Sequence, residues 1–311
     1  MKVLLVTNMY PTAVRPTFGI FVKEQVEDLE RLGCEIDVRV VRGDESRANY
    51  LRAMATVRSV VKEQRYDVVH AHYGLTGVVA LVQREHPVVV TFHGSDCNGD
   101  SPWQTAVSWI VSRLVTPIFV SAPLAAGLRL SNAHVIPAAV DVDRFAPIPR
   151  ERARATLGWL DEGPYVLLPG SRGERRKRAD LFDAALDAAR AEYPGIRGTS
   201  LENLSREEVA LTMNAVDAVL MTSNYEGSPV AVKEALACCT PVVSVPVADV
   251  PQLIEGLPGC GIAPRVPAEL AVELFRALNA ERSSVLRERV LPFSRQQVAA
   301  QVKRVYDEVV R

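Results

Sequence analysis

The sequence lacks an excess of charge of either sign, and its start lacks a long hydrophobic run. Lys and Arg total 36 and Asp and Glu total 37, so a formal charge of −1 gives no overall field to attract nucleic acid. The apolar run that ends at Asn8 is shorter than a signal-peptide core or a membrane span. We therefore expect a cytoplasmic protein that does not bind nucleic acid and that holds any anionic ligand at a local site.

Cysteine is scarce, and its spacing argues against two common roles. The five cysteines are an odd number without a Cys-x-x-Cys pair, which disfavours a disulfide framework and a zinc site. We expect them to be small core residues. A Gly-x-Gly-x-x-Gly turn is also absent after the first strand of either half, so a nicotinamide-dependent dehydrogenase is disfavoured.

The sequence pattern predicts an α/β fold. A length of 311 residues exceeds what one hydrophobic core usually spans, so two domains are expected. Short runs rich in Val and Ile alternate with segments of helical periodicity, which is typical of parallel sheets covered by helices. Six strands, enough for one doubly wound sheet, are predicted in the first half. They cover residues 2–7, 36–41, 68–72, 88–92, 118–120 and 135–139.

A second unit is predicted after residues 141–149, whose two prolines and lack of periodicity are typical of a linker. A helix is predicted over 179–193, and the pattern of a capping box at Ser205 and Glu208 predicts another helix start. The amphipathic segment 295–309 closes the chain. Strands are predicted over 165–168, 218–222, 242–245 and 261–263.

A basic loop joins the strand over 165–168 to the next helix. Glycines beyond the carboxyl end of a strand let backbone amides approach a pyrophosphate, and Arg and Lys supply charge. A solvated basic loop is an equally weighted alternative, because runs of charge usually face water. The loop reads Pro169-Gly170-Ser171-Arg172-Gly173-Glu174-Arg175-Arg176-Lys177-Arg178.

A helix with two carboxylates follows later in this half. Ser228 is a favourable N-cap and precedes a proline, so the helix is predicted to begin there. The amides of Gly227, Ser228 and Val230 would then be donors at a positive helix end, which favours an anionic or hydroxyl-rich ligand. Glu226 lies before the helix and Glu234 inside it, with seven residues between them. Without a role in binding, Glu226 would be an ordinary loop carboxylate and Glu234 an ordinary exposed helix residue.

These carboxylates and the residues around them resemble glycosyltransferase family 4. They form a Glu-x7-Glu motif, with Glu-Gly-Ser-Pro at Glu226 and Lys-Glu-Ala-Leu-Ala-Cys around Glu234. The resemblance covers essentially the whole chain. Its further matches are the Arg172-x4-Lys177 pair, Thr91-Phe92-His93-Gly94-Ser95-Asp96, Val135-Ile136-Pro137, Arg144-Phe145 and Pro241-Val242-Val243.

The resemblance implies the GT-B architecture, in which two Rossmann-like doubly wound domains face each other across a cleft. On that basis we expect an N-terminal acceptor domain over residues 1–145 and a C-terminal sugar-nucleotide domain over 146–293. A terminal helix over 294–311 is expected to pack back toward the N-terminal domain. Residues 194–203 stand where relatives have a strand, a helix and a second strand, so the C-terminal domain should be reduced.

The resemblance also implies roles for the C-terminal residues. Arg172 and Lys177 would neutralise the donor diphosphate as it leaves, in place of a metal ion, because fixed cations stabilise charge that grows in the transition state. Glu234 would hold the ribose hydroxyls. Glu226, together with the amides at the helix start, would bind the transferred sugar.

Two residues of the N-terminal half receive roles in the same way. His93 would face the reacting sugar, and Gly19 resembles part of a loop that approaches the donor phosphates. A lone histidine is more often a satisfied core residue. A histidine followed by glycine at the carboxyl end of a strand nevertheless favours a site.

The expected activity is a retaining transfer of a sugar from a nucleotide-diphosphate donor, a UDP-sugar, to an acceptor hydroxyl without a metal or other cofactor. The departing phosphate oxygen would take the acceptor proton, and a double displacement through a carboxylate ranks second. The acceptor is left open as a glycan, a lipid-linked molecule or a small molecule. The alternative function is a non-catalytic GT-B subunit that binds a partner transferase or a glycan.

Two patterns resemble metal sites but favour ordinary interpretations. Asp141-Val142-Asp143 matches a metal-binding string of other transferases, yet it lies in the linker, so we expect no metal. His70 and His72 share one side of a strand without a third ligand nearby in sequence, which favours buried strand residues.

A basic helix face is predicted before Tyr66. It carries Arg47, Arg52, Arg58, Lys62 and Arg65. Such a face either contacts an acidic acceptor or the anionic inner surface of a membrane, or is simply solvated. The solvated face is the interpretation we favour.

Overall fold

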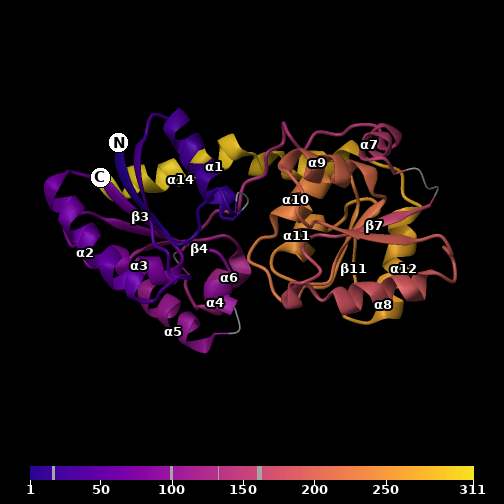
Figure 1. The fold of residues 1–311 in the computed structure, drawn as a ribbon, viewed down its shortest axis with the longest axis horizontal. Helices are drawn as coiled ribbons and strands as arrows, with labels where there is room; N and C mark the ends of the chain where they lie inside the picture. Colours follow the sequence, from indigo (N-terminus) through magenta and orange to yellow (C-terminus); the bar gives the residue numbers. More distant parts are fainter. Residues whose placement is uncertain (16–17, 99–100, 132, 160–162) are drawn as a thin grey trace. The chain divides into compact units, whose positions relative to one another are not determined.

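The computed structural model describes residues 1–15, 18–98, 101–131, 133–159 and 163–311, and the chain forms two compact units (Figure 1). Unit 1 contains Met1–Ala139 and Arg295–Arg311, and unit 2 contains Val140–Ser294. Each unit has one parallel β-sheet with helices packed against it, so the predicted α/β class is confirmed.

Unit 1 has a six-stranded sheet with the order β2-β1-β3-β4-β5-β6. All six predicted strands are present, but the last is shorter than predicted, because Pro137 has no backbone N–H to extend the pairing. The strands are β1 (Lys2–Thr7), β2 (Glu35–Val40), β3 (Val68–His72), β4 (Val88–Phe92), β5 (Thr116–Phe119) and β6 (His134–Val135). The helices are α1 (Ile20–Arg31), α2 (Ala48–Glu63), α3 (Gly74–Ala80), α4 (Ser95–Asn98), α5 (Pro102–Val111), α6 (Ala122–Gly127) and α14 (Arg295–Val310).

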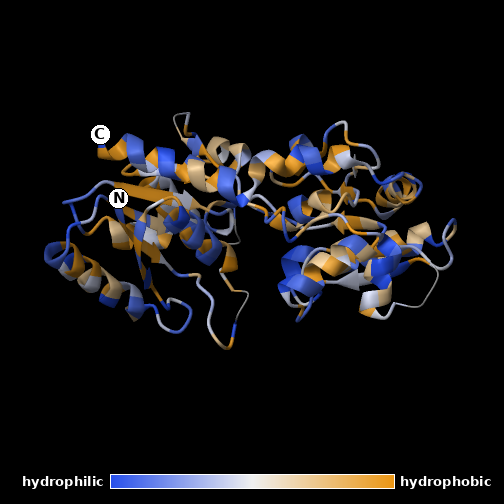
Figure 2. Cartoon of the chain, turned by 90° about the horizontal axis from the view of Figure 1, so that it is seen from above, coloured by the Kyte–Doolittle hydropathy of each residue, from blue (hydrophilic) through white to orange (hydrophobic). Residues whose placement is uncertain are grey.

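The strands of unit 1 are apolar on both sides because helices cover both faces of the sheet. Successive residues of a strand point to opposite faces. Leu4 and Val6 of β1 therefore pack with residues of α2, α3 and α5, whereas Val3 packs with residues of α14. The helices carry hydrophilic and hydrophobic residues side by side, as expected of elements with one buried face (Figure 2).

The C-terminal helix α14 belongs to unit 1. Val298, Val302 and Tyr306 recur about one turn apart and pack with Leu29 of α1 and the strands beneath them. The Tyr306 hydroxyl lies 2.6 Å from Nδ1 of His70. His70 is therefore a satisfied core residue, as the strand pattern favoured.

Unit 2 has a five-stranded sheet with the order β11-β10-β9-β7-β8. The capping box predicted at Ser205 and Glu208 is formed. The strands are β7 (Tyr165–Leu168), β8 (Arg197–Ser200), β9 (Ala218–Met221), β10 (Val242–Ser244) and β11 (Gly261–Ile262). The helices are α7 (Arg150–Leu157), η1 (Arg175–Lys177), α8 (Ala179–Ala189), α9 (Arg206–Ala215), α10 (Val230–Ala237), α11 (Val250–Ile254), α12 (Pro267–Leu278), α13 (Ser284–Val290) and η2 (Leu291–Phe293).

Strand β8 was not predicted from the sequence. It pairs with β7 at the edge of the sheet, and its four residues are exposed or half-buried, so the apolar signal of a central strand is missing. Gly198 fits beneath Phe182 of α8, because an added Cβ would lie 2.7 Å from the Phe182 ring. The segment 194–203 thus keeps one strand, and the sheet is less reduced than expected.

The boundary between the units lies at Ala139 and Val140, before the predicted end of the first domain at residue 145. Val140 and Phe145 are buried in the core of unit 2. The Val140 N–H also donates to the Phe293 carbonyl at 2.9 Å. These contacts make residues 140–145 part of unit 2.

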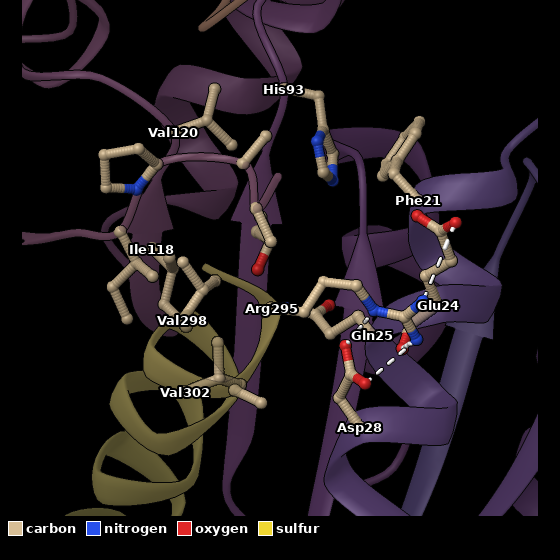
Figure 3. A pocket seen from close by; sticks show the side chains of 16 residues that line it. Phe21, Glu24, Gln25, Asp28, His93, Ile118, Val120, Arg295, Val298 and Val302 are labelled. Carbon is tan, nitrogen blue, oxygen red and sulfur yellow. Dashed lines mark hydrogen bonds and ion pairs between the residues drawn. The ribbon is translucent and has the colours of Figure 1, made fainter. Parts of the chain in front are cut away.

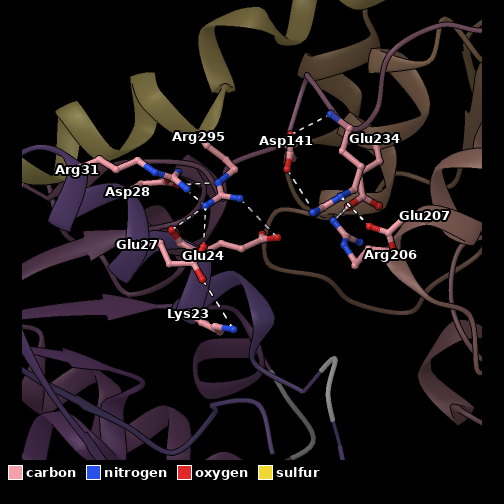
Figure 4. A network of polar contacts seen from close by, with 11 residues as sticks. Lys23, Glu24, Glu27, Asp28, Arg31, Asp141, Arg206, Glu207, Glu234 and Arg295 are labelled. Carbon is pink, nitrogen blue, oxygen red and sulfur yellow. Dashed lines mark hydrogen bonds and ion pairs between the residues drawn. The ribbon is translucent and has the colours of Figure 1, made fainter.

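Arg295, the first residue of α14, is held by three carboxylates of α1 (Figure 4). Its Nε lies 2.8 Å from Asp28 Oδ2 and its Nη2 lies 3.2 Å from Glu27 Oε2. The third partner, Glu24, lies 3.8 Å away. The side chains of Arg295 and Asp28 are 16% and 8% exposed, so this ion group fastens α14 to α1 largely out of water.

Arg295→Ala should destabilise unit 1, because it leaves the Asp28 carboxylate buried without this cation. We expect the free energy of unfolding, measured by urea denaturation, to fall by about 2–4 kcal/mol. Arg276→Ala is the control: Arg276 pairs with Glu273 on the surface of α12, and its loss should cost less than about 0.5 kcal/mol. Equal losses in the two variants would contradict the role of Arg295.

Candidate functional site

The basic loop after β7 places Lys177 inside unit 2. An added Cβ at Gly170 would lie 2.6 Å from Cε of Lys177, so glycine leaves the room that this side chain needs. Lys177 ends η1 and is 6% exposed. The hydroxyl of Thr222, which follows β9, donates to the Lys177 carbonyl at 2.7 Å. The alternative of a solvated basic loop is therefore wrong for Lys177, because its side chain is buried.

Glu226 binds two cations of that loop. Its Oε1 lies 2.7 Å from Nζ of Lys177 and 2.8 Å from Nη1 of Arg176. Burial alone would raise the pKa of the Glu226 carboxyl, but the charges of Lys177 and Arg176 hold that pKa below its ordinary value. Glu226 is therefore ionised at neutral pH. We call Lys177, Arg176 and Glu226 the Lys177 cluster.

Arg172 lies outside the Lys177 cluster. Its guanidinium pairs with Asp183 of α8, and its side chain is 40% exposed. We expected Arg172 and Lys177 to be the two cations of the site. Lys177 contacts Glu226, but the second cation at Glu226 is Arg176. The role of Arg172 stays a prediction.

Helix α10 begins next to Glu226. Its N-cap is Pro229, one residue later than predicted, and no side chain caps it. Among the described residues, no hydrogen bond is donated by the backbone amides of Gly227, Ser228 or Val230. These amides are therefore donors that a ligand can use at the positive end of the helix.

The hydroxyl of Ser228 joins two other polar groups. It accepts a hydrogen bond from Nζ of Lys233 at 2.6 Å and donates one to Oδ2 of Asp249 at 2.6 Å. Lys233 is fully buried, and this burial lowers its pKa to about 8 although the charges of Asp249 and Glu234 raise it. The two hydrogen bonds fix the turn that carries the Gly227 and Ser228 amides.

Glu234 lies on a buried side of α10. Its Oε1 lies 2.5 Å from Nη2 of Arg206 on α9, and its side chain is 3% exposed (Figure 4). The Arg206 guanidinium also lies over the ring of Phe145 at 4.8 Å. The interpretation of Glu234 as an exposed helix residue is therefore wrong. The two carboxylates of the Glu-x7-Glu motif contact different cations.

In unit 1 the structure brings Gly19 and His93 to the same edge of the sheet. His93 follows β4, and its ring lies 5.0 Å from the ring of Phe21 on α1. Gly19 precedes α1 with a φ of 71°, and an added Cβ would lie 2.4 Å from the Met9 carbonyl carbon, so glycine is required. Residues 16–17 of the same predicted loop lie outside the described residues.

His93 contacts a second histidine at the end of β3. Its Nε2 lies 2.9 Å from Nδ1 of His72, and the two rings stack at 5.1 Å. Burial lowers the pKa of His93, so the imidazole is neutral near pH 7. It therefore forms hydrogen bonds rather than ion pairs. A small pocket of unit 1 is lined by His93, Phe21 and Arg295, among other residues (Figure 3).

The candidate metal patterns have other contacts. Within the described ranges, no group of three His, Cys, Asp or Glu side chains is arranged to hold a metal ion. Asp141 accepts a hydrogen bond from the Arg144 amide at 3.0 Å and pairs with its guanidinium at 3.3 Å. The five cysteines are free thiols, and four of them are buried.

Two family models match the chain, one in each unit. A glycosyl transferase 4-like domain matches residues 3–129, and a glycosyl transferases group 1 domain matches residues 168–280. The second match contains both the basic loop and the Glu-x7-Glu motif. Together the two matches cover most of the chain and show that it is a glycosyltransferase.

This glycosyltransferase has relatives of modest identity. TuaC of Bacillus subtilis (strain 168), assigned to teichuronic acid biosynthesis as a glycosyltransferase, is 24% identical over 89% of each chain. The D-inositol 3-phosphate glycosyltransferase of Mycobacterium sp. (strain KMS) is 29% identical over 81% of this chain and 67% of its own length. That of Actinosynnema mirum is 27% identical, and the match spans 68% of this chain and 64% of the relative.

Solved structures share the fold of this glycosyltransferase. Sucrose-phosphate synthase from Thermosynechococcus elongatus has a TM-score of 0.81 at 19% identity, over 99% of this chain and 98% of its own. Anabaena HepE in complex with UDP has a TM-score of 0.73 at 16% identity, over 99% and 100%. The predicted GT-B fold is confirmed.

Sequence reasoning about this glycosyltransferase missed Arg176, Lys233 and Asp249. Arg176 stands in a run of four cations, where charge alone does not select one residue. Lys233 lies in a helix whose other residues are almost all apolar, and that signal could have indicated a buried lysine. Asp249 is brought to Ser228 by tertiary packing across 21 positions, which the sequence pattern does not show.

Ser228→Ala should destabilise unit 2, because it removes the hydroxyl between Lys233 and Asp249. We expect the free energy of unfolding, measured by urea denaturation, to fall by about 1–3 kcal/mol. The control is Ser284→Ala, at an exposed position of α13, which should cost less than about 0.5 kcal/mol. A parental stability of the Ser228 variant would contradict the role given to its hydroxyl.

Proposed function

We propose that this glycosyltransferase is a retaining, metal-independent enzyme of family 4 that transfers a sugar from a nucleoside-diphosphate donor to an acceptor hydroxyl. The observation that carries the proposal is the Lys177 cluster beside the first turn of α10. A buried ammonium, a guanidinium, a carboxylate and backbone donors lie together there. These are the groups that a sugar diphosphate needs.

Lys177 would act on the leaving diphosphate. Negative charge grows on the phosphate oxygens as their bond to the sugar breaks, and a fixed ammonium stabilises that charge more than it stabilises the ground state. Lys177 is 6% exposed, so water screens its charge weakly. Before the donor binds, Glu226 compensates this buried charge. A diphosphate carries more charge than one carboxylate and can share the ammonium.

The carboxylates would bind hydroxyl groups. Glu226 and the amides of Gly227, Ser228 and Val230 would hold the transferred sugar. Glu234, oriented by Arg206, would hold the ribose. A carboxylate whose pKa is held low by two cations is a weak nucleophile, so we rank a double displacement second. The departing phosphate oxygen would instead take the acceptor proton.

The donor is proposed from a structural neighbour, and the acceptor from the sequence resemblance. HepE was solved in complex with UDP and with UDP-glucose, and we propose a UDP-sugar here by analogy. His93 and Gly19 of unit 1 would contact the sugar and the phosphates. The acceptor hydroxyl would belong to a glycan, a lipid-linked molecule or a small molecule. A cytoplasmic location stays a prediction from the sequence.

Lys177→Met should lower kcat by about 10²–10³, because it removes a cation that acts mainly as the diphosphate leaves. Slow hydrolysis in a panel of UDP-sugars first identifies the donor. Arg175→Met is the matched control, since Arg175 is an exposed cation of the same loop, and it should retain kcat within about twofold.

Glu226→Ala completes this test. Full turnover in both the Lys177 and the Glu226 variants would show that the assigned roles are wrong. Suppose instead that the parent chain hydrolyses no sugar nucleotide and gains no thermal stability from any nucleoside diphosphate. That outcome would favour the non-catalytic GT-B subunit.

Chelation provides a separate prediction. If Lys177 takes the place of a metal ion, EDTA should leave the rate of donor hydrolysis unchanged. The measurement is that rate with and without EDTA, followed by addition of Mg²⁺. A rate that EDTA abolishes and Mg²⁺ restores would contradict metal independence.

A further inference from the structure

Helix α5 of unit 1 has an apolar side that no described element covers. Trp103, Trp109 and Ile110 are 51%, 46% and 52% exposed, and Leu114, just past the helix, is 63% exposed. Trp103 and Ile110 are seven residues apart and therefore lie on one side of the helix, with Trp109 next to Ile110 and Leu114 four residues beyond it. The opposite side, with Val111, is buried in the core of unit 1. Large apolar groups gathered in this way indicate an interaction surface.

The neighbouring helix α2 supplies positive charge. Both α2 and α5 pack against α3, and Val57 of α2, Val79 of α3 and Val111 of α5 share one core. The two helices therefore lie on the same face of the sheet. The segment 47–65 carries five cations and one carboxylate, Glu63. Its cations are Arg47, Arg52, Arg58, Lys62 and Arg65, all of them exposed.

The chemistry of this surface fits a lipid bilayer. Tryptophan favours the interface between water and lipid, where its apolar ring and its N–H are both satisfied. The Arg113 guanidinium lies 3.8 Å from the ring centre of Trp109, so a cation accompanies the aromatic groups. Cations with few carboxylates among them attract anionic headgroups. None of the helices in the described part of the chain has the length and hydropathy to cross a bilayer.

We propose that the outer faces of α2 and α5 form a docking surface on which unit 1 binds an anionic lipid bilayer. The apolar side chains of α5 enter the interface, and the α2 cations bind the headgroups. The proposal does not depend on the donor or on the mechanism of sugar transfer. For α2, we thus choose the membrane contact, which the sequence analysis ranked below a solvated helix face.

Vesicle flotation of the full chain tests the docking surface. We expect at least about tenfold more binding to vesicles of phosphatidylcholine mixed with phosphatidylglycerol than to phosphatidylcholine alone, and less binding at high salt. Trp109→Ser combined with Ile110→Ser should abolish binding. Val272→Ser combined with Phe275→Ser removes similarly exposed apolar groups from α12 of unit 2 and should leave binding unchanged.

Tryptophan fluorescence locates the surface directly. Two of the three tryptophans lie on α5, and the third is Trp159 of unit 2. A Trp159→Phe variant should shift its emission to shorter wavelength on anionic vesicles and should be quenched by brominated lipids. A variant with Trp103→Phe and Trp109→Phe, which keeps Trp159, should show neither effect.

Three outcomes would overturn the proposal. The first is no binding to any vesicle. The second is quenching of Trp159 equal to that of the α5 tryptophans. The third is a concentration-dependent dimer, detected by sedimentation, that the Trp109→Ser and Ile110→Ser substitutions abolish while vesicle binding persists; this would make α5 a surface between two copies of the chain.

Discussion

The contact between Lys177 and Glu226 joins two loops that follow neighbouring strands, β7 and β9, and the candidate donor site of unit 2 depends on it. A buried ammonium is stable only where an opposite charge and hydrogen-bond partners compensate for lost hydration. Glu226 meets that need at Nζ. Two other contacts position the lysine: the glycine at position 170 leaves room for its stem, and the hydroxyl after β9 donates to its carbonyl.

The positions of the strands along the chain could be predicted where burial leaves a clear signal. Central parallel strands such as β1, β7 and β9 read as nearly continuous apolar runs because both of their faces are covered. Edge strand β8 reads Arg-Gly-Thr-Ser, since one side meets water and a glycine makes room for Phe182. Polar edge strands therefore escape a prediction that rests on hydropathy.

The candidate site could be predicted to the level of motifs. Glu226 and Glu234 were found because their spacing is itself a pattern along one segment. The choice among neighbouring cations was harder, because the path of the loop decides whether Arg172 or Arg176 reaches Glu226. Asp249 shows the same limit, since its contact with Ser228 depends on packing between distant segments.

The paired ends of unit 2 have a consequence for protein engineering. Val140 and Ser294 form a β-bridge, so the chain enters and leaves unit 2 at adjacent points. Residues 140–294 are thus an insertion between the body of unit 1 and its last helix, the topology that favours excision and grafting of a module. A cut at residue 294 would not trim unit 2. It would instead strip α14 from unit 1 and uncover the sheet face around Val3 and His70.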